Sequence, residues 1–234
     1  FKQKTAYEIR LSLVGSEMCI RDRGRIAWIG LPFDGMDETL EQVVSGKFDP
    51  KSEAELLRKK TSVDAKAAAL GKKVIAAMQG GRAKEALDTV REMMRLDPLM
   101  FPRAAGTVFQ RVMVDMGEQE LAYEFAKEMF AGPIKDNAQD LNTIAWVILD
   151  DAAVKKRDIN LAFDMSKRAV ELTEEKEPAT LDTLARAYWE KGDPGKAIEL
   201  QLKAVDLANK NPSVPDSLRK TLETSLANYK KGRK

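Results

Sequence analysis

The pattern of apolar and polar residues divides the chain into a long helical part and a shorter upstream part of different character. From Asp64 onward, apolar residues recur with a period near 3.6, which predicts a series of amphipathic helices. These stretches are rich in Ala, Leu, Met, Glu and Lys, and short segments containing Gly, Pro and Asp separate them. The sequence therefore predicts a mainly α-helical protein whose helices are joined by short turns.

The upstream part predicts one strand followed by one helix. Residues 24–32, GRIAWIGLP, alternate in polarity like a β-strand and are bounded by glycine and proline. Asp37 is then suited to cap a helix that carries Leu40, Val43 and Val44 on its apolar side and ends at Gly46. A lone strand cannot form a domain, so residues 24–49 are expected to be one piece of an α/β or α+β fold.

The helical part contains an internal repeat. Its markers are four alanines spaced by 36, 40 and 35 residues, three of them preceded by a glycine at a distance of five: Ala86 with Gly81, Ala122 with Gly117, Ala162, and Ala197 with Gly192. A period of this size is typical of helical repeat arrays, whose units bury their apolar faces only by stacking. Small residues at facing positions allow two antiparallel helices to approach closely.

These units resemble the tetratricopeptide repeat, a helix-turn-helix of about 34 residues with small residues at fixed positions. The fourth unit matches best, through Leu184, Ala185, Tyr188, Gly192, Ala197 and Ala204. The resemblance implies a mainly α, right-handed solenoid of about four units at residues 64–212, preceded by a linker or linking helix at 50–63. A capping helix and basic tail are expected at 213–234, with an apolar side formed by Leu218, Leu222, Leu226 and Tyr229.

The third unit departs from the repeat pattern. Ala145 and Ala162 are 17 residues apart, whereas Ala185 and Ala197 in the fourth unit are 12 apart. The turn around Asp150 to Asp158 is therefore expected to be longer than the others by about one helical turn.

The strand and helix at 24–49 resemble the last strand and C-terminal helix of the thioredoxin-like fold. The resemblance rests on Gly24-Arg25-Ile26 in the strand and on Gly30 and Pro32 in the turn, as in redoxins related to extracytoplasmic thiol-disulfide oxidoreductases. In that family the Cys-x-x-Cys motif and the cis-proline lie upstream of this strand, and neither is present here. The resemblance implies a remnant of the fold with no catalytic residue.

Residues 1–23 match nothing that follows them. Translated back into codons, KQKTAYEI and LVGSEMCIRD resemble two adapters of short-read sequencing libraries, joined in one frame. The alternative is a native arm or a signal peptide, but Ser16 and Glu17 interrupt the apolar core that a signal peptide needs. We therefore expect an adapter-derived, non-native segment, a parent protein truncated on its N-terminal side, and no redox role for Cys19. Pairing of residues 18–22 with 26–29 would then imitate a missing native strand.

Composition narrows the possible functions. Outside residues 1–23 the acidic and basic residues are equal in number, which argues against a nucleic-acid partner that would require clustered Lys and Arg. The absence of histidine excludes Ser-His-Asp and Cys-His nucleophiles and every zinc site that uses histidine, and a single cysteine cannot form an intramolecular disulfide. The methionines follow helical spacing and are interpreted as core residues, and no apolar run is long enough to span a bilayer.

Candidate binding residues follow from the tetratricopeptide resemblance, in which the first helix of each unit lines a concave face. The positions that match are Thr107, Arg111 and Asp115 in the second unit, Asn142, Trp146 and Asp150 in the third, and Asp182, Arg186, Trp189 and Glu190 in the fourth. Asn, Arg and Trp in a groove suit an extended peptide, because they can hold its backbone and cover its apolar side chains. Alternatively, Trp146 and Trp189 pack between units, and Asp182 with Arg186 forms an ordinary surface pair.

The sequence therefore predicts a module that binds a protein or peptide in its groove, with no catalytic residue, cofactor or metal ligand and no membrane span. The alternative is that the repeats recruit substrates for a thiol-disulfide oxidoreductase whose Cys-x-x-Cys lies in the missing part. The family resemblance implies a periplasmic or other extracytoplasmic parent. The identity of the partner and the oligomeric state are not encoded in any recognisable motif.

Overall fold

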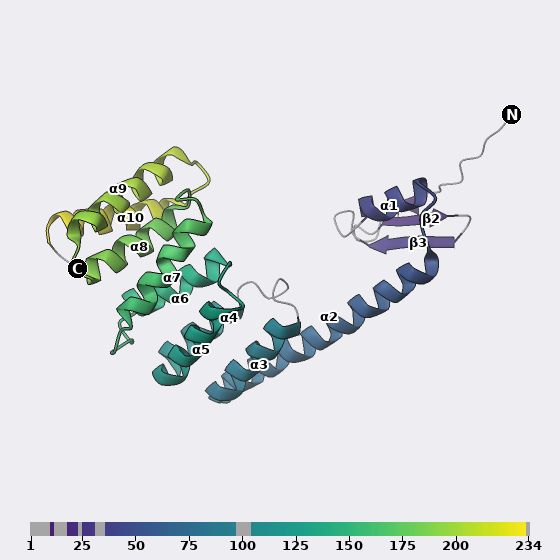
Figure 1. Ribbon diagram of the computed structural model, residues 1–234, viewed down its shortest axis with the longest axis horizontal. Coiled ribbons are helices and arrows are strands. Elements are labelled where there is room, and N and C mark those ends of the chain that lie inside the picture. The colour runs from purple at the N-terminus through teal and green to yellow at the C-terminus, as the bar shows by residue number, and fades with distance from the viewer. Residues whose placement is uncertain (1–9, 12–17, 23–24, 31–35, 97–103, 233–234) are drawn as a thin grey trace. The chain divides into compact units, whose positions relative to one another are not determined.

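The chain is mainly α-helical in the part that the computed structural model describes, namely residues 10–11, 18–22, 25–30, 36–96 and 104–232 (Figure 1). It divides into two compact units, Phe1–Ala65 and Lys66–Lys234. The predicted dominance of helices is confirmed. Among the described residues, no helix is both long enough and apolar enough to cross a membrane.

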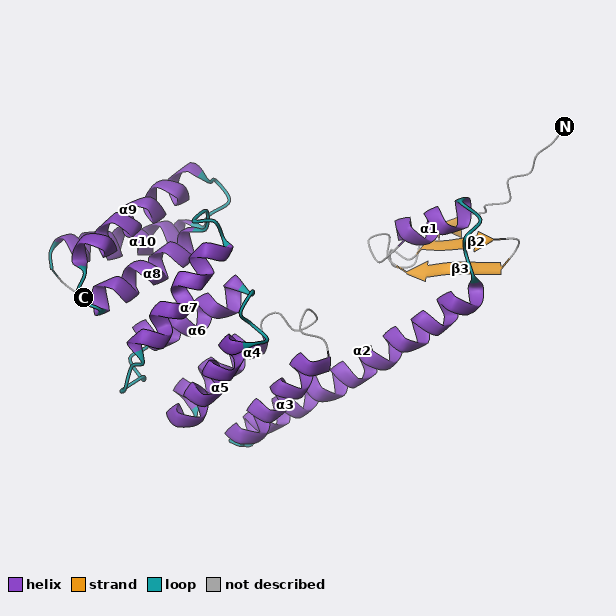
Figure 2. Cartoon of the chain, in the orientation of Figure 1, coloured by secondary structure: helices purple, strands orange, loops and turns teal. Residues whose placement is uncertain are grey.

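The first unit contains the strands, drawn in orange in Figure 2. Strands β1 (Arg10–Leu11), β2 (Met18–Asp22) and β3 (Arg25–Gly30) form an antiparallel sheet in the order β1-β2-β3. Cys19 pairs with Ile29 and Ile20 with Trp28, and an irregularity follows Ile20. The predicted strand is therefore confirmed, and it pairs with residues 18–22.

Helix α1 (Met36–Val44) contacts β3 and differs in detail from the helix that the sequence predicts. Asp37 lies in the first turn of the helix, where its charge favours the positive end of the helix dipole. Thr39 and Val43 are buried, whereas Val44 is exposed, so the prediction that Val44 lies on the apolar side is wrong. Gly46 follows the helix with φ of +72°, as expected for a residue that ends a helix.

Helix α2 (Pro50–Gln79) begins within the segment for which the sequence predicts a linker or linking helix. Its start has a local cause, because the carboxylate of Asp49 accepts hydrogen bonds from the backbone N–H groups of Lys51 and Ser52 at 3.1 and 3.2 Å. Pro50 occupies the first helical position, where its missing N–H costs nothing. The segment 50–63 and the residues that follow it to Gln79 are thus one continuous helix.

The second unit is a succession of helices with buried apolar faces. They are α3 (Ala83–Leu96), α4 (Ala104–Gln110) continuing into the π-helix η1 (Arg111–Asp115), α5 (Gln119–Ala131), α6 (Ala138–Asp150), α7 (Ile159–Leu172), α8 (Pro178–Glu190), α9 (Pro194–Lys210) and α10 (Asp216–Lys230). Helices α6 and α7 pack together, as do α8 and α9, and α6 also packs against α8. Helix α10 packs against α9 and α8.

Alanine and methionine fill the interior of this unit. The four repeat-marking alanines, Ala86, Ala122, Ala162 and Ala197, are fully buried, as the close approach of facing helices requires. Met93, Met94, Met113 and Met129 are buried too, which confirms their interpretation as core residues. In α10, Leu222 and Tyr229 are buried, and Leu218 and Leu226 are half-buried on the same side.

The turn between α6 and α7 is long, as predicted. It comprises residues 151–158, whereas the turn between α8 and α9 comprises residues 191–193. The extra residues do not form a helical turn, and hydrogen bonds fix their position. Arg157 donates to the carbonyl of Ile148 at 3.1 Å and to that of Asp151 at 2.9 Å. The hydroxyl of Tyr123 donates to the carbonyl of Lys156 at 2.7 Å. These bonds fasten the turn to α5 and α6.

The predicted turn glycines have the conformation that their position requires. Gly81, Gly117 and Gly192 have φ of +68°, +71° and +84°, in the left-handed region that other residues rarely adopt. Each follows a helix and lets the chain reverse into the next one.

Substitution of Gly192 by alanine is expected to lower the free energy of unfolding by about 1 kcal/mol, because the added Cβ disfavours a positive φ although it meets open space. Gly195→Ala is the matched control, since Gly195 lies in the first turn of α9 and a Cβ there makes only ordinary contact, at 3.6 Å from Asp193 Oδ1. This control is expected to be neutral or stabilising by up to about 1 kcal/mol. Urea unfolding followed by circular dichroism measures both, and equal effects at the two sites would contradict the assignment.

Candidate functional site

The sequence-predicted residues fall into two groups in the structure. Thr107 lies on α4, and Arg111 and Asp115 lie in η1, whereas the remaining residues lie on α6 and α8. Arg111 and Asp115 form an ion pair with each other, with Nε and Oδ2 3.2 Å apart, and both side chains are more than half exposed. Such a pair contributes little to stability.

Part of the second group meets where α6 packs against α8. Nη2 of Arg186 lies 3.6 Å from Oδ1 of Asp150 on α6 and 3.3 Å from Oε1 of Glu190 on α8. The side chains of Arg186 and Glu190 are only 16% and 10% exposed. We call Asn142, Trp146 and Asp150 of α6 together with Arg186 and Glu190 of α8 the α6–α8 seam. Here the guanidinium bridges two helices, which differs from the alternative that Asp182 and Arg186 form an ordinary surface pair.

Two polar atoms of the α6–α8 seam are buried without a hydrogen-bond partner in the described structure. They are Oδ1 of Asn142, an acceptor, and Nε of Arg186, a donor. Buried polar atoms are nearly always hydrogen-bonded, and leaving one unpaired costs about 1–3 kcal/mol. An acceptor and a donor without a protein partner therefore lie buried on neighbouring helices.

Asp182 does not lie on an open face, contrary to the prediction. Its side chain is 5% exposed, and Oδ1 accepts a hydrogen bond from Nε2 of Gln201 at 2.7 Å. Burial raises the pKa of Asp182 to about 6, the Gln201 hydrogen bond lowers it, Asp150 raises it and Arg186 lowers it. The carboxyl group belongs to the interior between α8, α9 and α10.

Trp189 packs against the C-terminal helix. Its ring stacks on that of Tyr229, with centroids 4.7 Å apart and planes 22° apart. Burial raises the pKa of the Tyr229 hydroxyl above its usual value, the charge of Asp182 raises it further, and the neighbouring Arg186 lowers it. The alternative that Trp189 fills a packing position is the one that the structure favours. Trp146 is half-buried on α6.

Gln201 is the residue of this region that the sequence reading missed. It lies fully buried on α9 between Ala197 and Ala204, two positions of the same apolar stripe. Its position in the sequence could have revealed it, because Gln201 is a polar residue at a helical position where a buried apolar residue is expected. A buried amide requires hydrogen-bond partners for both its oxygen and its nitrogen. Tyr229 was predicted only as an apolar residue of the capping helix.

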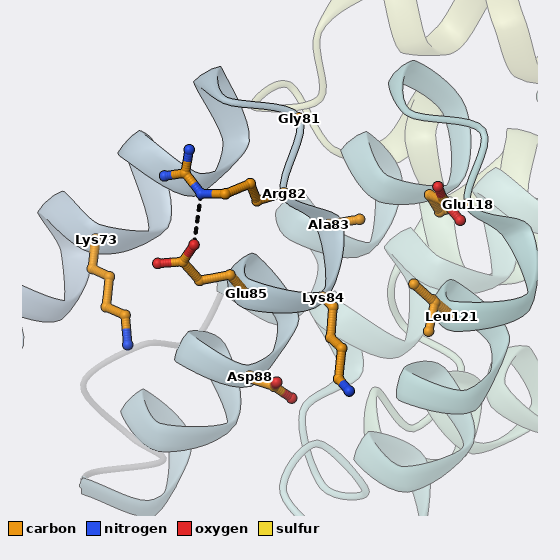
Figure 3. A pocket seen from close by; sticks show the side chains of 9 residues that line it. All are labelled: Lys73, Gly81, Arg82, Ala83, Lys84, Glu85, Asp88, Glu118 and Leu121. Atoms are coloured by element: carbon orange, nitrogen blue, oxygen red, sulfur yellow. Dashed lines mark hydrogen bonds and ion pairs between the residues drawn. The ribbon is translucent and has the colours of Figure 1, made fainter.

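A separate pocket of about 560 Å³ lies at the turn between α2 and α3 (Figure 3). Figure 3 shows Lys73 and Lys84 beside the ion pair of Arg82 and Glu85, whose Nε and Oε2 atoms are 2.6 Å apart. Most charged groups of this pocket are exposed, and the pocket contains none of the sequence-predicted residues. A smaller hollow of about 180 Å³ is lined by Thr107, Gln139, Asp140 and Thr143.

A buried hydrogen bond between two helices lies at the smaller hollow. Asp140 is buried and accepts a hydrogen bond from the backbone N–H of Gly106 at 3.1 Å, which joins α4 to α6. A Cβ on Gly106 would lie 2.9 Å from Oδ1 of Asp140, so only glycine allows this approach. Thr143 Oγ1 donates to the carbonyl of Gln139 at 2.8 Å. Asp140 and Thr143 are thus hydrogen-bonded within the protein. The α6–α8 seam, which has buried polar atoms without partners, is therefore the candidate site.

The residues of the α6–α8 seam favour some kinds of chemistry over others. Within the described residues, no group of three or more Asp, Glu, Cys or His side chains is arranged to hold a metal ion. Arg186 is a fixed cation, and Asp150 and Glu190 are both engaged with it, an arrangement that suits recognition of a polar chain better than proton transfer. No protein-family model matches the chain, and no curated protein is significantly similar to it, so the site is interpreted from its own geometry.

Proposed function

We propose that residues 64–212 form a tetratricopeptide-like repeat array that binds an extended segment of another protein, and that residues 213–234 cap it. The proposal is supported by the alanine period, by the positive φ of the turn glycines and by the burial of the repeat-marking alanines. It is also supported by the packing of α6 against α8, the first helices of consecutive units. Stacked units of this kind present one row of first helices to a ligand.

The observation that carries the binding role is the pair of unsatisfied polar atoms at the α6–α8 seam. In this proposal the ligand displaces the side chains that bury these atoms, Oδ1 of Asn142 accepts from its backbone N–H group, and Nε of Arg186 donates to its carbonyl or carboxylate oxygen. An extended peptide offers both groups at every residue. Trp146, half-buried on the same helix as Asn142, provides an apolar surface for a side chain of the ligand.

We also infer that β3 and α1 derive from the last strand and C-terminal helix of a thioredoxin-like domain. The support is the sequence Gly24-Arg25-Ile26 with Gly30 and Pro32, the strand at residues 25–30 and the contact of α1 with β3. In this proposal the repeats are the interaction module of a redoxin-type parent, and the chain described here binds without catalysing a reaction.

Selection of a phage-displayed library of random dodecapeptides on the immobilised full chain tests the binding role. We expect enriched peptides whose binding, measured by fluorescence anisotropy, weakens at least tenfold in Asn142→Ala and in Arg186→Ala, as for the loss of one or two charge-assisted or buried hydrogen bonds. Circular dichroism establishes that both variants remain folded.

Matched controls are Asn209→Ala and Lys167→Ala, which remove an amide and a cationic side chain from exposed positions on α9 and α7. Both are expected to bind like the wild type. The proposal fails if no peptide is enriched, or if folded Asn142→Ala and Arg186→Ala variants bind as tightly as these controls.

A further inference from the structure

The amide of Gln201 connects a buried carboxyl group to the C-terminal helix. Nε2 of Gln201 donates to Oδ1 of Asp182 on α8 at 2.7 Å and to the backbone carbonyl of Leu222 on α10 at 3.1 Å. Gln201 is fully buried, and Asp182 is 5% exposed. Both N–H groups of the amide are therefore used, and they hold α10 against α8 and α9.

The other end of the same amide has no partner. Oε1 of Gln201 is buried and accepts no hydrogen bond in the described structure. An ionised carboxylate cannot supply the missing donor, because it only accepts, whereas a protonated carboxyl group has one O–H donor. Oε1 and Nε2 are bonded to the same carbon, so a neutral carboxyl group facing the amide can bond to both ends at once.

The charges around Asp182 also disfavour its ionised form. Asp150 on α6 faces Asp182 with a like charge. Arg186 on α8 carries the opposite charge, but it is shared with Asp150 and Glu190. The groups that face Asp182 from α10 and α9 are the neutral hydroxyl of Tyr229 and the uncharged Gln201. One guanidinium is thus shared among several carboxyl groups. Desolvation is the largest cause of the raised pKa of Asp182, about 6.

We propose that Asp182 holds a proton in the docked state of α10 at acidic pH, that its O–H then donates to Oε1 of Gln201, and that this acid–amide pair makes the docking of α10 dependent on pH. The carboxyl group then donates one hydrogen bond to the amide and accepts one from it, and the amide keeps its bond to Leu222. The inference needs no ligand and goes beyond the proposed binding role.

The direction of the pH dependence follows from proton linkage. Asp182 binds its proton more tightly in the docked state, with a pKa of about 6, than in an undocked, hydrated state with the ordinary value of 3.8. The stabilisation is fully present below pH 4 and is lost as the pH rises through 6. Between pH 5 and pH 8 the ratio of docked to undocked α10 is expected to fall about tenfold.

Hydrogen–deuterium exchange of peptides covering residues 216–230 tests the proposal on the full chain. After correction for the intrinsic exchange rate, we expect protection of α10 to fall about tenfold from pH 5 to pH 8 in the wild type. Asp182→Asn should stay protected at both values, because its amide can donate to Oε1 and accept from Nε2 without a proton from solution. Asp206→Asn, an exposed acid on α9, is the matched control and should behave like the wild type.

A second measurement does not depend on any variant. The side-chain carboxyl resonance of Asp182 in the wild type, followed by NMR against pH, should titrate near 6. The proposal is overturned if Asp182 titrates below 4, if corrected protection of α10 is the same at pH 5 and pH 8, or if Asp182→Asn is as sensitive to pH as the control.

Discussion

Replacement of Phe125 by alanine is expected to lower the free energy of unfolding by about 3–5 kcal/mol. Phe125 lies on α5, is fully buried, and belongs to the larger hydrophobic cluster of the second unit. Its ring also contacts the guanidinium of Arg91 on α3, whose Cζ lies 5.4 Å from the ring centroid. Removal of the ring takes away apolar burial, leaves a cavity and breaks the cation–π contact, and these losses act in the same direction.

Urea unfolding at pH 7, followed by circular dichroism at 222 nm, measures this loss. Glu124→Ala is the control on the same helix, because Glu124 is exposed and its truncation removes no core contact. The control is expected to change stability by less than about 0.5 kcal/mol. A Phe125→Ala variant as stable as Glu124→Ala would show that α5 is not packed as described.

Gln201→Ala is expected to cost about 2–4 kcal/mol, although it replaces a polar side chain by an apolar one. The amide satisfies Asp182 and the carbonyl of Leu222, and both would be left buried without this donor. The free energy lost is the desolvation penalty of two unpaired groups together with that of a small cavity. The same urea titration at pH 7 measures it.

The adjacent residue provides the control for this change. Leu202 is 45% exposed on α9, so Leu202→Ala removes more apolar atoms but from a position in contact with water. It is expected to be nearly neutral, within about 0.5 kcal/mol. If Gln201→Ala and Leu202→Ala are equally mild, the amide does not hold α10, and the linkage between α8, α9 and α10 must be reconsidered.

Turns and buried small residues could be predicted from the sequence because their causes are local. A glycine after a helical stretch is the residue that tolerates positive φ, and the observed values at Gly81, Gly117 and Gly192 follow from that preference. The longer turn after α6 was likewise predicted by counting residues between two alanines. No long-range information is needed for either inference.

The environment of Asp182 could not be predicted in this way. Helical spacing places it one turn before Arg186, which suggested an exposed pair on one helix. In the structure α10 covers the region, and Arg186 instead contacts Asp150 from a different helix. Burial by α10, which begins only at Asp216, cannot be inferred from the local pattern around Asp182.

Two features of the backbone could not be predicted from the pattern of apolar and polar residues. The sequence predicts a linker or linking helix at residues 50–63; the segment is helical, because its Ala, Glu, Lys and Leu residues are strong helix formers, and the same helix continues to Gln79. Residues 111–115 form a π-helix, in which the N–H of Met116 reaches the carbonyl of Arg111 at 3.0 Å. A single wider turn of this kind has no distinctive composition.

The packing of the second unit has a consequence for how the chain folds. The helix pairs with extensive contacts, such as α6 with α7, α6 with α8, and α8 with α9, are neighbours or next neighbours along the chain. The loops that must close to form these contacts are therefore short, and their closure entropy is small. Topologies dominated by such local contacts belong to the fast-folding class.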